Sequence, residues 1–349
     1  MAIRGDRERH RVHRRINQGV AAMSLEGIPS IDDVRAARQA IRPYINSTPV
    51  HEWKGRLLSE SVAQGTEVVL KFELFQRAGS FKARGALLGI LALDQDARQR
   101  GVTAVSAGNH AIAVSYAANA LGVDAKVVMQ SSANPARVAA AEAFGAEVII
   151  GGDGPACFAL AEKIVEEEGR TFIHPFEGHN VTLGTATLGL EICEQAGELD
   201  ALVIPVGGGG LASGVALMAK QLMPGCKVYG VEPAGADSMS RSFAAGSPQT
   251  LDKVATIADS LGPPMALPYS FGICRENIDR LVTVEDDAIR AAMRLLFAEL
   301  KLAVEPAAAA GTAALVGPLR DELAGKRVGI IICGTNIDPA THARLLQEG

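Results

Sequence analysis

The chain of 349 residues has few aromatic residues, few cysteines and no excess of positive charge. Aromatic residues make up only 4% of it, which argues against the stacking platforms that bind nucleic-acid bases. The formal net charge of −5 points the same way, because nucleic-acid-binding surfaces are usually basic. The five cysteines include no CxxC pair, so neither a disulfide framework nor a zinc site is indicated.

The sequence also lacks an apolar run long enough to cross a membrane. Its one strongly basic segment, residues 4–15, has no apolar stretch behind the arginines and does not resemble a secretory signal. We expect residues 1–23 to form a disordered extension. These absences predict a reduced, cytoplasmic protein without nucleic-acid or membrane partners.

From Ser30 onward, short apolar segments alternate with helical patterns. The predicted strands are Glu67–Phe72, Thr103–Ser106, Ala125–Met129, Glu147–Ile150, Ala201–Val206, Lys227–Val231, Leu281–Val284 and Arg327–Cys333. The predicted helices are Ser80–Leu93, His110–Leu121, Asn134–Phe144, Pro155–Glu168, Gly184–Gln195, Leu211–Leu222 and Glu285–Leu300. Strands that are apolar throughout must be covered on both faces, so this alternation predicts an α/β fold with parallel sheets. Ser30 and Asp33 predict a capping box, and Gly262–Arg275 is expected to be a long surface loop.

The strongest local signal is an apolar strand that runs into four glycines, Gly207–Gly210, and then into a helix. Glycines let the backbone turn sharply, and the free N–H groups of the loop and helix start favour a phosphate. Three interpretations stay open from this loop alone. It is a tight turn without a ligand, a cradle for a phosphate, or a loose dinucleotide fingerprint with Ala212 and with Glu232 as the ribose-binding acid.

Three other segments carry candidate functional side chains. Lys82 lies one turn into a predicted helix beside Phe81, and is either a solvated lysine or a semi-buried amine with a lowered pKa. Ser106–His110 follows a strand and is either a capped turn or a carboxylate-binding helix start. Cys333 ends an apolar strand and, taken alone, is a structural cysteine.

In this order and spacing the four motifs resemble the fold-type II pyridoxal-phosphate enzymes, in the branch of threonine and serine dehydratases (ammonia-lyases) and serine racemases. The similarity runs from about Ile31 to Asp338. It implies a tryptophan synthase β-like fold of two domains, each an open, mostly parallel sheet with helices on both faces. Residues 24–95 and 177–349 would form the large cofactor-binding domain, and residues 96–176 the small substrate-side domain. The resemblance also implies a homodimer.

The resemblance assigns roles to individual residues. Lys82 matches the lysine that holds pyridoxal 5′-phosphate as a Schiff base and acts in catalysis. The implied cofactor contacts are Lys82, Phe81, Asn109, Gly207, Gly208, Gly209, Gly210, Leu211, Glu305 and Cys333. The implied contacts to the amino-acid substrate are Ser106, Ala107, Gly108, Asn109 and His110.

The implied reaction removes water from a small β-hydroxy amino acid of the L-threonine or L-serine type and yields a 2-oxo acid and ammonia. Ala107 stands where serine racemases have a serine base, so elimination is expected to dominate over racemisation. Ser238 stands where metal-binding members have a second acid after Glu232, which argues against a divalent metal site without excluding it. The alternatives are a β-replacement synthase and a dehydratase of a bulkier or acidic 3-hydroxy amino acid. A further alternative is a non-catalytic binding protein that keeps the fold, and outside this class the alternative is a dinucleotide-binding oxidoreductase.

Overall fold

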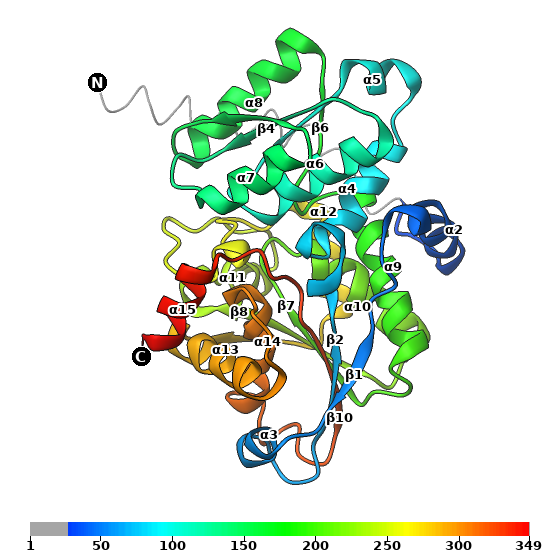
Figure 1. Ribbon diagram of the computed structural model, residues 1–349. Helices are drawn as coiled ribbons and strands as arrows, with labels where there is room; N and C mark the ends of the chain where they lie inside the picture. Colours follow the sequence, from blue (N-terminus) through cyan, green and yellow to red (C-terminus); the bar gives the residue numbers. More distant parts are fainter. Residues whose placement is uncertain (1–26, 349) are drawn as a thin grey trace.

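The computed structural model describes residues 27–348, and the extension predicted for residues 1–23 lies outside this range. The described chain forms two sheets with helices packed on both, the smaller sheet above the larger one in Figure 1. No helix within the described range has the length and apolar character needed to cross a bilayer.

Two short strands, β1 and β6, were not predicted, and the others match the predicted apolar segments to within a few residues. The strands are β1 (Val50–Trp53), β2 (Glu67–Lys71), β3 (Val102–Val105), β4 (Ala125–Met129), β5 (Glu147–Ile150), β6 (Thr171–Phe172), β7 (Ala201–Pro205), β8 (Lys227–Pro233), β9 (Arg280–Val284) and β10 (Arg327–Ile331). The larger sheet has the order β1-β2-β10-β7-β8-β9, and the smaller sheet β5-β4-β3-β6. Neighbouring strands are parallel except for β1 and β2. The predicted α/β fold with parallel-sheet cores is confirmed.

Helices connect most of the parallel strands, as crossover connections require. They are α2 (Ile31–Ile41), α3 (Arg56–Ser61), α4 (Lys82–Leu91), α5 (Gln95–Arg100), α6 (Asn109–Leu121), α7 (Pro135–Ala143), α8 (Gly154–Glu168), α9 (His179–Gln195), α10 (Gly210–Leu222), α11 (Ser238–Ala245), α12 (Pro268–Asn277), α13 (Asp286–Leu300), α14 (Pro306–Val316) and α15 (Pro339–Gln347). Around the larger sheet, α13 and α14 lie on one side of the strands and α9 and α10 on the other (Figure 1).

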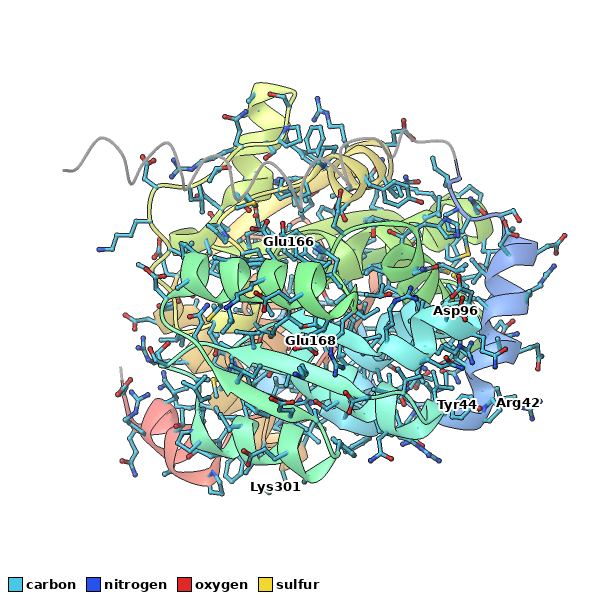
Figure 2. All side chains as sticks on the ribbon, turned by 90° about the horizontal axis from the view of Figure 1, so that it is seen from above. Arg42, Tyr44, Asp96, Glu166, Glu168 and Lys301 are labelled. Atoms are coloured by element: carbon cyan, nitrogen blue, oxygen red, sulfur yellow. The ribbon has the colours of Figure 1, made fainter. Side chains whose placement is uncertain are left out.

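The smaller sheet is buried on both faces because successive side chains of a strand point to opposite sides. Ala104 and Val127 join a hydrophobic cluster with α4 and α6, whereas Val105 and Val128 join a separate cluster with α8. Helix α2 adds Ile41 to the first cluster and lies at the side of this layer, where Figure 2 labels the following residues, Arg42 and Tyr44. Helix α4 therefore belongs to the core of the smaller sheet although it precedes that sheet in the chain.

Two local predictions have different outcomes. The capping box of α2 is confirmed, because the Ser30 hydroxyl accepts from the backbone N–H of Asp33 at 3.2 Å and the Asp33 carboxylate accepts from that of Ser30 at 2.9 Å. The surface loop predicted for Gly262–Arg275 is wrong in its second part, where α12 begins at Pro268. The carboxylate of Glu177 accepts the first free N–H groups of α12, so the capping group comes from a distant part of the chain.

Candidate active site

A cavity of about 430 Å³ lies at the carboxyl ends of the strands of the smaller sheet. The segments that follow β3, β4 and β6 all contribute to its wall, as does the start of α8 after β5. These lining residues are Ser106, Ala107, Gly108, Asn109, His110, Gln130, Gly154, Pro155, Phe158, His174, Pro175 and Phe176. Lys82 and parts of residues 251–267 complete the lining. Ligands of open parallel sheets bind at this edge, so the cavity is the candidate active site.

Lys82 reaches this cavity from the first turn of α4. Its amine donates a hydrogen bond to the carbonyl oxygen of Pro175 and lies 5.3 Å from the centre of the Phe81 ring. Burial lowers the pKa of the Lys82 amine to about 8, against the opposing effects of Cys333 and Glu305. The amine is therefore neutral, and nucleophilic, in a much larger fraction of molecules at neutral pH than an ordinary lysine is.

Two histidines of the cavity wall are neutral. Nε2 of His110 lies 2.8 Å from the carbonyl oxygen of Ile173, and Nδ1 of His174 accepts from the backbone N–H groups of Phe176 and Glu177. Burial lowers the pKa of both histidines to about 3, and the charge of Lys82 adds to the effect. Neither ring carries a charge near neutral pH, so the lysine is the principal cation in its part of the cavity.

A buried carboxyl group lies behind the Ser106–His110 segment. The Asn109 amide donates to Oε1 of Glu305 at 2.6 Å and accepts from the Asn336 amide at 2.6 Å. Glu305 is 1% exposed, and its Oε2 has no hydrogen-bond partner among the described residues. Burial raises the pKa of Glu305 to about 7, although Arg137 and Asn109 oppose this. The site thus holds a carboxyl group that exchanges its proton near neutral pH.

Arg137 also lines the cavity, although no sequence motif marks it. Its guanidinium pairs with Asp259, donates to the carbonyl oxygen of Asn336 at 2.8 Å, and lies 3.7 Å from Glu305. Arg137 is in the first turn of α7, directly after β4, and so shares the sheet edge that carries Ser106. Because ligands of parallel sheets bind at this edge, the position of Arg137 soon after a predicted strand is the feature of the sequence that could have indicated its role.

The four glycines lie at the start of α10, and their surroundings leave no room for side chains. A Cβ atom on Gly208 would lie 2.3 Å from the Phe176 ring, and Gly209 has a φ of +92°, which favours glycine. Gly207, Gly208, Gly209 and Gly210 do not themselves line the 430 Å³ cavity, and Phe176 lies against Gly208 and Gly210. Leu211 is buried in the core of the larger sheet.

Phe81, Cys333 and Glu232 lie outside the lining as well. The backbone N–H of Phe81 donates to the carbonyl oxygen of Cys333 at 3.3 Å, and burial raises the pKa of the Cys333 thiol well above its usual range. Both carboxylate oxygens of Glu232 accept from the first N–H groups of α11, at 2.8 Å from Met239 and 2.7 Å from Ser240. Glu232 is therefore occupied as a helix cap and not available to a ribose. Among the described residues there is no cluster of three or more metal-ligating side chains.

Fold and site together define an α/β enzyme with two mostly parallel sheets and a half-buried lysine of lowered pKa in its cavity. Residues 41–334 match the family model for pyridoxal-phosphate dependent enzymes. The chain is 53% identical to phenylserine dehydratase of Ralstonia pickettii over 92% of this chain and 98% of that protein. It is 38% identical to L-threo-3-hydroxyaspartate ammonia-lyase of Saccharomyces cerevisiae, over 92% and 97% respectively. The crystal structure of the T.th. threonine deaminase has a TM-score of 0.82 at 40% identity and covers 89% of this chain and 99% of that one.

The chain belongs to the pyridoxal-phosphate-dependent enzymes, among their dehydratases and ammonia-lyases. The predicted enzyme class and cofactor are confirmed, and the alternative of a dinucleotide-binding oxidoreductase is not supported. The residues of the cleft fit this cofactor. The cavity itself contributes a half-buried lysine amine, and behind its lining lie a neutral buried thiol at Cys333 and a glycine cradle at a helix start that has no side-chain cap. Free N–H groups at such a helix start favour a phosphate.

Proposed function

We propose that this enzyme eliminates water from a 3-hydroxy amino acid that carries a bulky apolar group on C3, and releases a 2-oxo acid and ammonia. The observation that carries this proposal is the apolar wall of the cavity. Its members are Phe158, Phe176, Leu251, Met265 and Leu267, together with Pro155, Pro263 and Pro264. Such a wall stabilises a large apolar substituent, because burying a phenyl-sized group contributes about 2–3 kcal/mol. The identity to phenylserine dehydratase supports the same choice.

An acidic C3 substituent is less favoured by the charges of the cavity. A second substrate carboxylate would need a cation that is not already neutralised. Arg137 is paired with Asp259, with Glu305 at 3.7 Å, so its charge is already balanced by carboxyl groups. Lys253 is exposed next to Asp252.

A substrate of the threonine or serine size remains the second candidate, as the sequence resemblance predicts. The similarity to threonine deaminase favours it. A methyl group or a hydrogen on C3 would, however, leave most of the apolar wall without contact.

We assign the following roles to the residues of the site. Lys82 holds the cofactor and moves the proton of C2, and the start of α6 binds the substrate carboxylate with its free N–H groups. When bound, the cofactor supplies an electron sink for the electrons released at C2. The residues proposed around it are Phe81, Asn109, Gly207, Gly208, Gly209, Gly210, Leu211, Glu305 and Cys333. The residues proposed around the substrate carboxylate are Ser106, Ala107, Gly108, Asn109 and His110.

A substrate panel tests this proposal. Phenylserine, threonine, serine and 3-hydroxyaspartate would be compared for release of 2-oxo acid and ammonia. We expect kcat/KM to be about 100-fold higher for phenylserine than for serine, because the phenyl group is buried. Lys82→Ala should lose both turnover and the visible absorbance of the bound cofactor. Equal or greater kcat/KM for serine would reject the bulky-substrate proposal in favour of the second candidate.

A variant of the wall sharpens the panel. Phe158→Ala should reduce the preference for phenylserine over serine by about 3- to 10-fold, the size of one aromatic contact. Phe297→Ala is the matched control, because Phe297 is 43% exposed on α13 and is not part of the cavity. An unchanged preference in Phe158→Ala would exclude Phe158 from the binding of the C3 substituent.

The homodimer and the cytoplasmic setting also stay proposals that rest on the sequence resemblance and composition. Light scattering of the purified protein tests the dimer, for which a mass of twice 36.4 kDa is expected.

A further inference from the structure

His174 lies in the short segment that leads from the smaller sheet to α9 and lines the cavity. Its ring is held edge-to-face between two aromatic rings, with centres 6.0 Å from Phe172 and 4.8 Å from Phe176. Packing on both sides fixes the plane of the imidazole, so its polar atoms point in defined directions.

The hydrogen bonds of His174 determine which nitrogen carries the proton. Nδ1 accepts from the backbone N–H groups of Phe176 at 3.3 Å and Glu177 at 3.0 Å, so this nitrogen carries no hydrogen. A neutral imidazole has one N–H, which must then be on Nε2. No group in the described part of the chain accepts a hydrogen bond from Nε2 of His174. The ring therefore offers the cavity an unused N–H donor.

The N–H donor of the His110 ring, in contrast, is already used within the protein. Its Nε2 lies 2.8 Å from the carbonyl oxygen of Ile173, so a hydrogen on this nitrogen is occupied inside the protein. Of the two neutral histidines beside Lys82, only His174 has a donor that is free for a ligand. The His174 ring lies near two parts of the site. A charge on His110, which belongs to the proposed carboxylate site, lowers the pKa of His174, and the ring packs against Phe176, which lies against Gly208 and Gly210 of the glycine cradle.

We propose that Nε2–H of His174 donates a hydrogen bond to the 3-hydroxyl oxygen of the substrate and stabilises it as it leaves. This inference rests on the proposed function, because it requires a hydroxyl leaving group. The elimination breaks the C2–H and C3–O bonds and forms a C2=C3 double bond. The C2 proton goes to the amine of Lys82, and the C3–O electron pair leaves with the oxygen. The ammonium group formed on Lys82 then gives a proton to this oxygen, which departs as water, and the amine is neutral again. One proton leaves carbon and one reaches oxygen, so no net proton is consumed.

In this step His174 keeps its own proton. A neutral N–H donor cannot hand over its hydrogen at neutral pH, but it stabilises the negative charge that develops on the oxygen. A donor fixed in advance at such a position contributes a rate factor of about 10²–10³. The two backbone N–H groups on Nδ1 and the flanking rings provide this fixed orientation.

The test uses a substrate whose leaving group needs no such donor. His174→Asn keeps an acceptor oxygen near the position of Nδ1 and removes the Nε2 donor. With the 3-hydroxy substrate that the wild type turns over best, we expect kcat to fall about 10²-fold and KM to change little. With 3-chloroalanine, from which chloride departs without protonation, kcat should stay within about 3-fold of the wild type.

Two further measurements exclude a merely structural effect. The visible absorbance and the thermal midpoint show whether the variant holds its cofactor and its fold. His174→Phe keeps the aromatic packing but loses both nitrogens, and it should show the same selective loss on the hydroxy substrate. It also replaces His174→Asn if that variant does not fold.

Equal losses on the hydroxy and the chloro substrates would overturn the role of His174 and leave the proposed function standing. A wild type that releases chloride from 3-chloroalanine but turns over no 3-hydroxy amino acid would overturn the proposed function, and this inference with it. The two failures are therefore distinguishable in one set of assays.

Discussion

Two clusters of charged side chains each include a residue of α4 and differ in how completely their groups are paired. The first, called here the anchor cluster, contains Lys71, Glu73, Arg84 and Glu191, with two positive and two negative charges. Each carboxylate oxygen in it accepts at least one hydrogen bond, and Arg84 alone donates five. The second, called the site cluster, contains Lys82, Arg137, Asp259 and Glu305. In it one oxygen of Glu305 has no hydrogen-bond partner among the described residues.

Helix α4 connects the two clusters. Lys82 and Arg84 are two residues apart, which is about 200° around a helix, so they project from nearly opposite faces. The anchor cluster holds one face of α4 with paired charges, and the other face presents the amine to the cavity. Full pairing makes the anchor cluster rigid. In the site cluster, burial brings the pKa of Lys82 to about 8 and that of Glu305 to about 7, because their charges are only partly compensated by partners.

Removing the central cation of the anchor cluster should have the largest effect on stability. Arg84→Met leaves Glu73 and Glu191 buried without their main partner, so the free energy of unfolding should fall by about 3–5 kcal/mol. Urea unfolding measures this. The matched control is Arg344→Met, which removes a surface pair with Glu348 and should cost less than about 0.5 kcal/mol. Similar small losses in both variants would show that the anchor cluster does not differ from surface pairs.

Local sequence patterns predicted the fold and two loops that follow strands, whereas the roles of the site residues come from the family resemblance and stay predictions. Apolar segments mark the strands, and Ser106–His110 and the glycine loop each begin where a strand ends. No sequence signal marks His174, because the strand before it, β6, is only two residues long and has no recognisable pattern. Ion pairs between residues that are far apart in the chain likewise have no recognisable pattern in the sequence. Arg137 meets Asp259 from 122 residues away, and the raised proton affinity of Glu305 depends on burial among segments from several parts of the chain.

Removing a charge from the site cluster should raise the free energy of unfolding, whereas removing one from the anchor cluster lowers it. Burial raises the pKa of Glu305 from 4.5 to about 7, so the folded protein favours its protonated form. Above pH 4.5, Glu305 is ionised in the unfolded chain but stays protonated in the folded protein up to about pH 7. The free energy of unfolding therefore falls as pH rises from about 4.5 through 7. Glu305→Gln removes this loss. We expect it to stabilise the protein at pH 8 by up to about 3 kcal/mol and to have little effect at pH 4.

Glu73→Gln is the matched control for this experiment, because it removes a carboxylate that is paired with Arg84. It should destabilise the protein at pH 8, where Glu305→Gln stabilises it. Thermal unfolding at the two pH values measures both variants. A change of the same sign in both would remove the distinction between the two clusters.

The smallest expected effect concerns the pH dependence of cofactor capture. The neutral amine attacks the aldehyde, and burial lowers the pKa of Lys82 to about 8. Below that value the rate at which the apoprotein gains visible absorbance should rise about tenfold per pH unit, and above it the rate should level off. A small lysine derivative in solution, with its pKa near about 10.4, should show no levelling at pH 8.

Glu305→Gln should shift the pH at which the rate of cofactor capture levels off. This shift would show that the charge of Glu305 acts on the amine of Lys82. The negative charge of Glu305 raises the pKa of the Lys82 amine, and burial lowers it. Without that charge, burial should lower the pKa of the Lys82 amine further. The rate of cofactor capture should therefore level off at a lower pH in the variant than in the wild type. Glu73→Gln lies across α4 in the anchor cluster and should leave the levelling pH unchanged. An unchanged levelling pH in Glu305→Gln would mean that the carboxyl group is already protonated, and so uncharged, when the cofactor binds.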